Sequence, residues 1–164
     1  MKESKYLKDN IQNIEKLLSL PILKHFSTEI LGNLLNLSKI RQYEDGELIL
    51  EEGNDDPWLY FIISGEVKIV KGDEVLTVLR EKGDVFGEMG LLGHTEKTAS
   101  VYAVGHTICL TTDSTHIEKL SKDDKMAFLY ILYRVLAEVV TDRLKKTSDE
   151  LIAAKKEIAM LKNK

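Results

Sequence analysis

The sequence predicts a mostly β protein, an antiparallel jelly roll or β-roll of the double-stranded β-helix type, flanked by N-terminal helices and one long C-terminal helix. Three observations carry this prediction. Between residues 38 and 112, short β-forming runs alternate with glycine-containing turns. On both sides of this region, apolar residues recur at the spacing of a helix. Residues 125–161 contain neither glycine nor proline, which permits one helix about 55 Å long at 1.5 Å per residue.

The N-terminal segment, residues 1–37, is predicted to be helical. Apolar residues at helical spacing between residues 5 and 19 predict a first helix, which Pro21 closes. Ser27 is placed to cap a second helix, whose apolar face runs from Ile30 to Leu37. These helices precede the β region.

The β region, residues 38–112, contains seven predicted strands separated by turn residues such as Ser64-Gly65 and Gly105. The predicted strands are Lys39–Tyr43, Leu48–Leu50, Leu59–Ile63, Glu66–Val70, Val75–Leu79, Thr98–Val104 and Thr107–Thr111. Many short strands with glycine turns indicate a sandwich, jelly roll or barrel, because a fold of alternating strands and helices needs longer connections.

The C-terminal segment, residues 113–164, returns to the helical pattern. Thr115-x-x-Glu118 and Ser121-x-x-Asp124 are both helix-start signals. The long helix, about 125–161, carries an apolar stripe that shifts by one residue near its middle. The stripe consists of Leu129, Leu132, Leu136 and Val139, then Val140, Leu144, Thr147, Leu151, Ala154, Ile158 and Leu161. Sustained three-four spacing favours a homodimer through this helix, and a helix docked on its own roll is the alternative.

Composition and charge restrict the classes of function. A content of 43% hydrophobic and 30% charged residues is typical of a folded globular chain. No apolar run approaches the roughly 20 residues of a membrane span, so we expect no membrane segment. The single Cys109 stands between Ile108 and Leu110, which predicts a buried thiol and a reducing cytoplasm. The net charge of −4 lacks the basic footprint of a DNA-binding domain, and four scattered histidines predict no metal site.

The residues best suited to binding a ligand lie in two neighbouring segments. In Phe86-Gly87-Glu88-Met89-Gly90, the glycines allow close backbone approach, and a helix starting near Glu88 would point free N–H groups at an anion. Lys97 adds a positive charge, while Thr98 and Ala99 add hydrogen-bond donors. A carboxylate at Glu88 suits a sugar hydroxyl better than a phosphate. The alternative is a glycine turn with a solvated glutamate and lysine.

Two signatures in this chain resemble the cyclic nucleotide-binding domain family. The first is the strand–turn–strand segment 48–65, with its spaced glycines Gly53 and Gly65. The second is Phe86-Gly87-Glu88-Met89-Gly90-Leu91, followed after five residues by Lys97-Thr98-Ala99-Ser100-Val101-Tyr102-Ala103, which resembles the family's phosphate-binding cassette (86–103). Together the two signatures cover about residues 38–112, with flanking helices in the matching order.

The resemblance implies a role for each residue of the cassette. Glu88 accepts a hydrogen bond from the ribose 2′-hydroxyl, and backbone amides of Gly87, Met89, Gly90, Thr98 and Ala99 surround the cyclic phosphate. In the family the position of Lys97 is usually an arginine, whose planar fork grips phosphate through two bonds that lysine does not offer. In members with a long C-terminal helix, a Thr-Ser pair reaches the purine. Thr147-Ser148 resembles this pair.

The resemblance implies a regulatory module rather than an enzyme. It would bind cAMP or cGMP as its ligand and dimerise through the C-terminal helix. By rearranging that helix, it would signal to a downstream protein, which the sequence does not identify. Because the chain stops within the long helix, we expect no helix-turn-helix domain after it. The alternative is a structural module that keeps the roll without a ligand, with a pocket that Lys97 has made inactive.

Overall fold

The computed structural model describes residues 1–5, 7, 20, 23–24, 28–88, 96–115 and 120–162. It divides into two compact units, Met1–Ile131 and Leu132–Lys164. The first unit contains the whole sheet, and the second consists of the greater part of the long helix.

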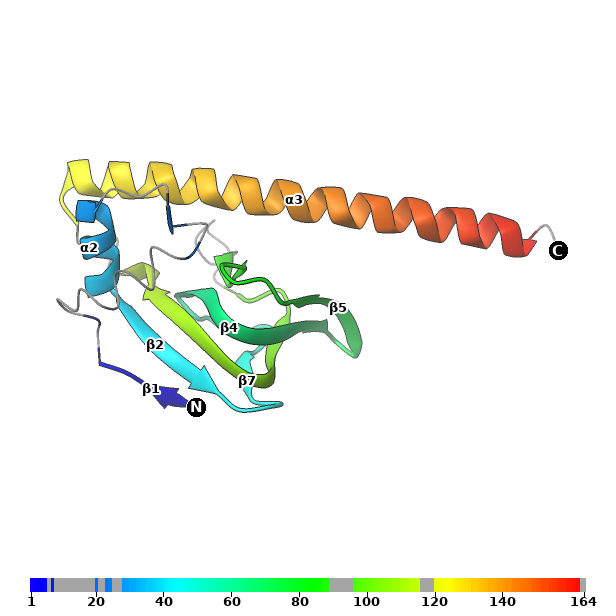
Figure 1. The fold of residues 1–164 in the computed structure, drawn as a ribbon, viewed down its shortest axis with the longest axis horizontal. Helices are drawn as coiled ribbons and strands as arrows, with labels where there is room; N and C mark the ends of the chain where they lie inside the picture. Colours follow the sequence, from blue (N-terminus) through cyan, green and yellow to red (C-terminus); the bar gives the residue numbers. More distant parts are fainter. Residues whose placement is uncertain are drawn as a thin grey trace. The chain divides into compact units, whose positions relative to one another are not determined.

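Within the described residues, the first unit is built around a seven-stranded sheet in which every pairing is antiparallel (Figure 1). The strands are β1 (Lys2–Glu3), β2 (Ser38–Tyr43), β3 (Leu48–Leu50), β4 (Trp58–Lys71), β5 (Glu74–Leu79), β6 (Val85–Phe86) and β7 (Ser100–Asp113). Their order is β1-β2-β7-β4-β5, with β3 on β7 and β6 on β4. The prediction of an antiparallel β-roll is confirmed.

The roll contains fewer and longer strands in its centre than the sequence predicts. The predicted strands Leu59–Ile63 and Glu66–Val70 form one strand, β4. The predicted strands Thr98–Val104 and Thr107–Thr111 form one strand, β7, which begins at Ser100. Gly65 and Gly105 were therefore wrongly interpreted as turns between strands. The short strands β1 and β6 were not predicted.

Gly65 allows β4 to cross β7 closely without ending the strand. Its φ is +87°, and the pairing of β4 with β7 changes register on both sides of it. A Cβ at this position would lie 2.5 Å from the His106 carbonyl oxygen and 2.7 Å from the Thr107 Cα. The Thr107 hydroxyl donates to the Glu66 carbonyl oxygen at 2.8 Å. This glycine therefore produces a bulge and a bend in a continuous strand.

The core of the roll lies between the strands. It consists of Tyr43, Ile49, Leu50, Tyr60, Ile62, Val67, Leu79, Phe86, Val101, Ala103 and Cys109, with Trp58 and Ile69 packed against it. Cys109 is fully buried, as the sequence predicts, and burial raises the pKa of its thiol to about 12. A thiol in this setting stays protonated at neutral pH.

The helices agree with the sequence pattern where they are described. Helix α2 spans Thr28–Asn36 and buries Leu31, Leu34 and Leu35. Its predicted cap, Ser27, and the predicted first helix after residue 7 lie outside the described residues. Helix α3 spans Lys122–Lys162, close to the predicted 125–161. It starts after Ser121, whose carbonyl oxygen accepts from the Lys125 N–H at 2.8 Å.

Among the described residues, none of the helices is both long and apolar enough to span a membrane.

Candidate functional site

The first half of the cassette is a glycine turn built directly on β4. Strand β6 pairs with β4, and the ring of Phe86 stacks on that of Tyr60 at 4.8 Å between centroids. Gly87 follows with a φ of +82°, and a Cβ there would lie 2.7 Å from the Trp58 carbonyl oxygen. Only glycine fits this position, because both its φ and its distance to β4 exclude a side chain.

The second half of the cassette pairs with the loop 51–57. The Gly53 N–H donates to the Lys97 carbonyl oxygen at 2.8 Å, and the Lys97 N–H donates to the Asn54 carbonyl oxygen at 3.0 Å. Asp55 and Glu96 form an isolated antiparallel bridge in the same place. These contacts hold the backbone of Lys97 before β7 begins.

The side chain of Lys97 joins the two halves. Its ammonium donates to the Gly87 carbonyl oxygen at 3.1 Å, and the residue is only 4% exposed. Burial lowers the pKa of Lys97, while the nearby carboxylates of Asp56, Glu88 and Asp55 offset part of this effect. The carbonyl is a neutral acceptor. An anion in its place would form an ion pair with the same ammonium, in which donor and acceptor are both charged.

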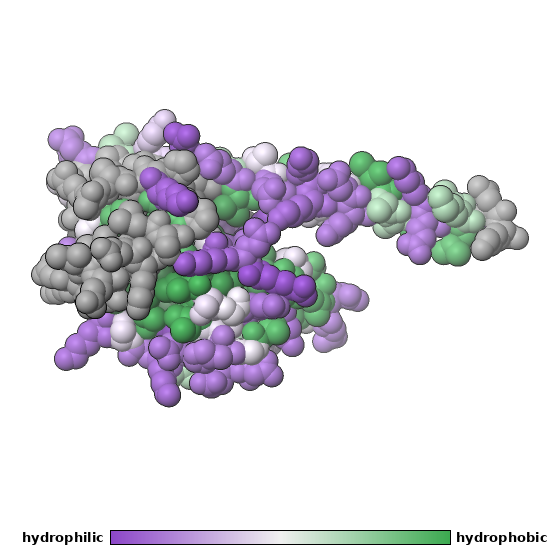
Figure 2. Space-filling view, viewed as in Figure 1, coloured by the Kyte–Doolittle hydropathy of each residue, from purple (hydrophilic) through white to green (hydrophobic). Residues whose placement is uncertain are grey.

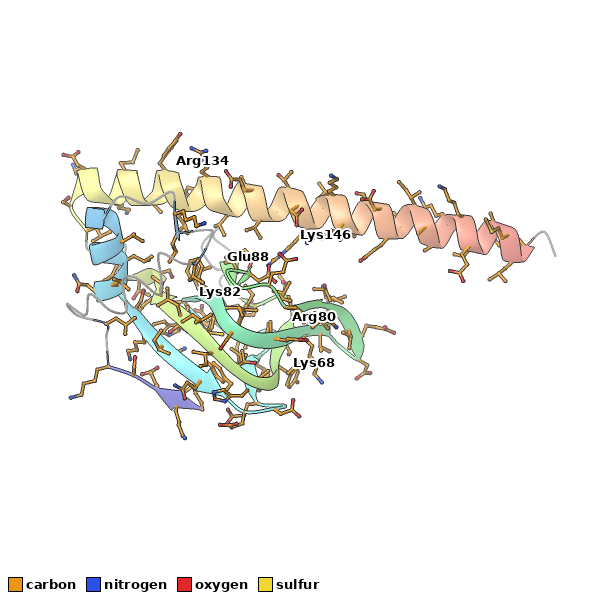
Figure 3. All side chains as sticks on the ribbon, in the orientation of Figure 1. Lys68, Arg80, Lys82, Glu88, Arg134 and Lys146 are labelled. Carbon is orange, nitrogen blue, oxygen red and sulfur yellow. The ribbon has the colours of Figure 1, made fainter. Side chains whose placement is uncertain are left out.

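The other predicted cassette residues lie on the same two segments as Gly87 and Lys97. Glu88 is half-buried on the turn after β6 (Figure 3). Thr98 is exposed and Ala99 half-buried, in the bend before β7. The amides of Gly87, Thr98 and Ala99 donate no hydrogen bond to a described residue. Met89 and Gly90, which the sequence also assigns to the cassette, lie outside the described residues.

Sequence reasoning missed the acidic loop beside Lys97. One carboxylate oxygen of Asp56, Oδ1, accepts from the Trp58 N–H at 2.7 Å, and its other oxygen accepts from the Tyr60 hydroxyl at 3.5 Å. The pair Asp55-Asp56 in the loop was a visible signal. The sequence could not show that this pair lies beside Lys97, because the bridge between Asp55 and Glu96 joins residues that lie far apart in the sequence.

Trp58 contacts two parts of the site. Its backbone carbonyl lies against the Gly87 turn, and its ring lies against the guanidinium of Arg41. The Arg41 guanidinium carbon lies 4.1 Å from the centroid of a Trp58 ring, and an Arg41 N–H donates to the Tyr60 hydroxyl at 3.0 Å. Arg41 is held in turn by Glu3 of β1 at 2.7 Å. Since Trp58 is the one tryptophan of the chain, tryptophan fluorescence reports on this turn alone.

The remaining predicted site residues, Thr147 and Ser148, lie on α3 in the second unit and are exposed. Among the described residues, no group of histidine, cysteine, aspartate and glutamate side chains is arranged to hold a metal ion.

The fold and the site together define a class of protein: a β-roll in which a glycine turn after one strand and a lysine before another are joined by a hydrogen bond.

A family model described as "Cyclic nucleotide-binding domain" matches residues 40–124, slightly more than half of the 164 residues. The chain belongs to the cyclic nucleotide-binding domain family. The resemblance seen in the two signatures is confirmed.

Relatives and solved structures agree with this assignment. The chain is 33% identical over 99 residues to the cAMP-dependent protein kinase type II regulatory subunit of Drosophila melanogaster, and 28% identical over 130 residues to the cGMP-dependent protein kinase of Plasmodium berghei. The matches cover 58% and 75% of this chain but only 26% and 15% of those relatives. A crystal structure of a cyclic nucleotide-binding domain from Methylobacillus flagellatus shares the fold, with a TM-score of 0.73 at 20% identity over 86% of this chain and 83% of that one.

Proposed function

We propose that this chain is a regulatory module that binds a cyclic nucleotide, cAMP or cGMP, in the cassette 86–103 and performs no catalysis itself. The observation that carries the proposal is the contact between Lys97 and Gly87, which brings the only cation of the described cassette to the glycine turn. Membership of the family and its similarity to kinase regulatory proteins support a regulatory role. The proposed setting is the reducing cytoplasm, which suits a buried free cysteine.

In this proposal each cassette residue has one task. The Lys97 ammonium leaves the Gly87 carbonyl and binds the cyclic phosphate, while amides of Gly87, Met89, Gly90, Thr98 and Ala99 donate to the phosphate oxygens. Glu88 accepts from the ribose 2′-hydroxyl. Lysine makes one point contact where an arginine would make two parallel bonds, so the affinity is lower than a forked contact would give.

Signalling in this proposal uses α3. The chain forms a homodimer through this helix, and ligand binding shifts the population of its arrangements toward one that a downstream protein recognises. Thr147 and Ser148 contact the base, one residue from each subunit. Their exposed side chains are compatible with that role.

A specific observation favours a second candidate, a structural module without a ligand. Lys97 is buried and already has an acceptor, and three carboxylates, Asp56, Glu88 and Asp55, lie near it. A phosphate entering the cassette would meet these negative charges as well as the lysine. In this alternative the lysine is a structural link between the two halves of the cassette.

Titration of the full chain with cAMP and with cGMP separates the two candidates. We expect heat of binding by calorimetry and a change in Trp58 fluorescence for at least one nucleotide. A Lys97→Met variant should lose about one to two decades of affinity, since a charge-assisted bond contributes about 1.5–3 kcal/mol. Lys97→Arg should bind more tightly. Lys71→Met, at an exposed position at the end of β4, is the matched control and should bind normally.

No heat and no thermal stabilisation with either nucleotide at millimolar concentration would contradict nucleotide binding and leave the structural module as the function.

A further inference from the structure

Strand β2 carries a charged side chain on the core face of the roll. Arg41 of β2 pairs with Cys109 of β7, which in turn pairs with Ile62 of β4. Residues that pair directly across neighbouring strands lie on the same face of the sheet, and both Cys109 and Ile62 are fully buried core residues. Figure 2 shows hydrophilic residues projecting from the visible surface of the roll, which is where charged side chains usually lie. The Arg41 side chain, by contrast, is only 12% exposed, so its partners show what it supports.

The Arg41 guanidinium joins β1 to two aromatic residues of β4. Its Nε donates to the Glu3 carboxylate at 2.7 Å, and another N–H of the same group donates to the Tyr60 hydroxyl at 3.0 Å. Its carbon lies 4.1 Å from the centroid of a Trp58 ring. A flat guanidinium can stack on one ring while its edge donates to two oxygens, and a lysine ammonium offers no such plane. Arg41 therefore fixes the side chains of Tyr60 and Trp58 relative to each other.

Both aromatic residues form the surface on which the cassette turn rests. The Tyr60 ring stacks on Phe86, with 12° between the ring planes. A Cβ on Gly87 would lie 3.2 Å from Cδ2 of Tyr60, in addition to the 2.7 Å contact with the Trp58 carbonyl oxygen. Since close-packed residues pass small displacements on to their neighbours, a shift of Tyr60 or Trp58 also shifts Gly87.

The same two residues hold the acidic loop next to Lys97. The Trp58 N–H and the Tyr60 hydroxyl donate to the two carboxylate oxygens of Asp56, at 2.7 Å and 3.5 Å. A guanidinium has no acceptor, so the Tyr60 hydroxyl accepts from Arg41 and its own proton stays available for Asp56. Asp56 is one of the carboxylates near the Lys97 ammonium. Through Tyr60, Arg41 thus acts on both the cassette turn and the acidic loop.

We propose that Arg41 is a positioning residue of the nucleotide site, which holds the Gly87 turn in place through Tyr60 and Trp58 without contacting the ligand. The inference rests on the proposed function and extends the site to a residue of β2, far from the cassette in sequence. Glu3 extends it further to β1, because its carboxylate balances the charge of the guanidinium. Removing Arg41 should free the turn and weaken nucleotide binding, although every residue that contacts the ligand in the proposed site is unchanged.

The position of the turn can be measured without nucleotide. In the ¹⁵N-labelled full chain, Arg41→Met should shift the NMR amide resonance of Gly87. Tyr60→Phe should shift it in the same direction, because it removes the hydroxyl through which Arg41 acts. An unchanged Gly87 resonance in Arg41→Met overturns the positioning role.

The matched control is Arg80→Met, directly after β5 (Figure 3). Arg80 also forms an ion pair with a glutamate, Glu66 at 3.2 Å, but its side chain is 68% exposed. The Gly87 resonance should therefore stay unchanged in this variant, and an equal shift there would overturn the assignment to Arg41.

Nucleotide affinity tests the consequence for binding. In calorimetry, Arg41→Met should bind the cyclic nucleotide about three- to tenfold more weakly than the natural chain. Arg41→Lys should recover little of this loss, because an ammonium cannot stack on Trp58 and donate to two oxygens as the guanidinium does. In the double variant with Tyr60→Phe, the loss should be smaller than the sum of the two single losses, since both changes break the same link. Fully additive losses would overturn the action of Arg41 through Tyr60.

Two comparisons keep the outcomes separate. Leu31→Ala, in α2 outside the sheet, removes buried packing and should lower the free energy of unfolding at least as much as Arg41→Met while leaving affinity unchanged. An equal loss of affinity in Leu31→Ala would assign the effect of Arg41 to general stability and overturn the proposal. If the natural chain binds neither cAMP nor cGMP, the proposed function fails, and the Gly87 resonance decides separately whether Arg41 positions the turn.

Discussion

The roll and the long helix use their apolar side chains in opposite ways. In the roll, Tyr60, Ile62 and Leu110 on β4 and β7 are at most 1% exposed, since neighbouring strands and packed side chains cover them. On α3, Leu144 and Leu161 are each 65% exposed. The roll thus completes its own core within one chain, whereas these helix side chains stay exposed and would be covered only in the proposed homodimer. Stability and association should therefore respond to different mutations.

The largest expected effect compares one leucine from each region. Leu110→Ala, in the centre of β7, should lower the free energy of unfolding of the roll by about 2–5 kcal/mol through the cavity it leaves. Leu144→Ala should change it by no more than about 0.5 kcal/mol and weaken the dimer instead. Urea denaturation followed by Trp58 fluorescence measures the first effect, and sedimentation the second. Equal losses of roll stability would show that the two regions are not separate in this way.

Glycine substitutions sharpen the same comparison within the roll. Gly65→Ala should cost roughly 2–4 kcal/mol, because the left-handed φ and the approach of the His106 carbonyl both oppose a Cβ. Gly72→Ala is the matched control. It also has a positive φ, but no atom lies within 4 Å of its added Cβ, so its cost should be only about 1 kcal/mol. Urea midpoints of the two variants provide the measurement, and similar midpoints would contradict the tight crossing.

The pH dependence of stability tests the buried position of Lys97. Burial lowers the pKa of Lys97 below its usual 10.5. Above the lowered value and below 10.5, the unfolded chain therefore holds a proton that the folded chain has lost, and the free energy of unfolding rises with pH. Below this window the charged lysine destabilises the folded state. Compared with Lys97→Met, the natural chain should thus gain stability from neutral to alkaline pH in urea titrations. A constant difference between the two proteins would argue against a buried ammonium.

The smallest effect concerns the acidic loop. Asp56→Asn preserves the acceptor for the Trp58 N–H but removes a negative charge near Lys97. Cyclic nucleotide affinity should rise about two- to fivefold, because one repulsive charge at the phosphate is lost. Asp73→Asn, in the exposed turn after β4, should leave affinity unchanged. An unchanged or lower affinity of Asp56→Asn in calorimetry would place Asp56 away from the ligand.

Much of the fold was predictable because its signals are local. Glycines, β-forming runs and a glycine-free helix each report on their own neighbourhood, and the roll, α2 and α3 follow from them. What could not be predicted depends on pairs of distant residues. In the sequence Gly65 indicates a turn, and only the pairing of β4 with β7 shows that the strand continues through it. Likewise, Asp55 pairs with Glu96 only in the folded chain.

The cassette shows the same division. Gly87 and Lys97 were identified as its two parts, but their contact depends on the folded backbone. On α3, the single apolar stripe predicted from the sequence contains the buried Leu132 and Leu136 as well as the exposed Leu144 and Leu161, and only the structure distinguishes them.

Gly87 and Lys97 differ in how strongly the fold restricts the residue at each position. Any side chain at Gly87 collides with the backbone of Trp58, so the conformation of this turn depends on the position of β4. Lys97 reaches the turn only through the tip of a long side chain. The Lys97 side chain can therefore be replaced by another without moving the backbone. In the proposed nucleotide site, affinity could therefore be changed at this position without altering the backbone of the turn.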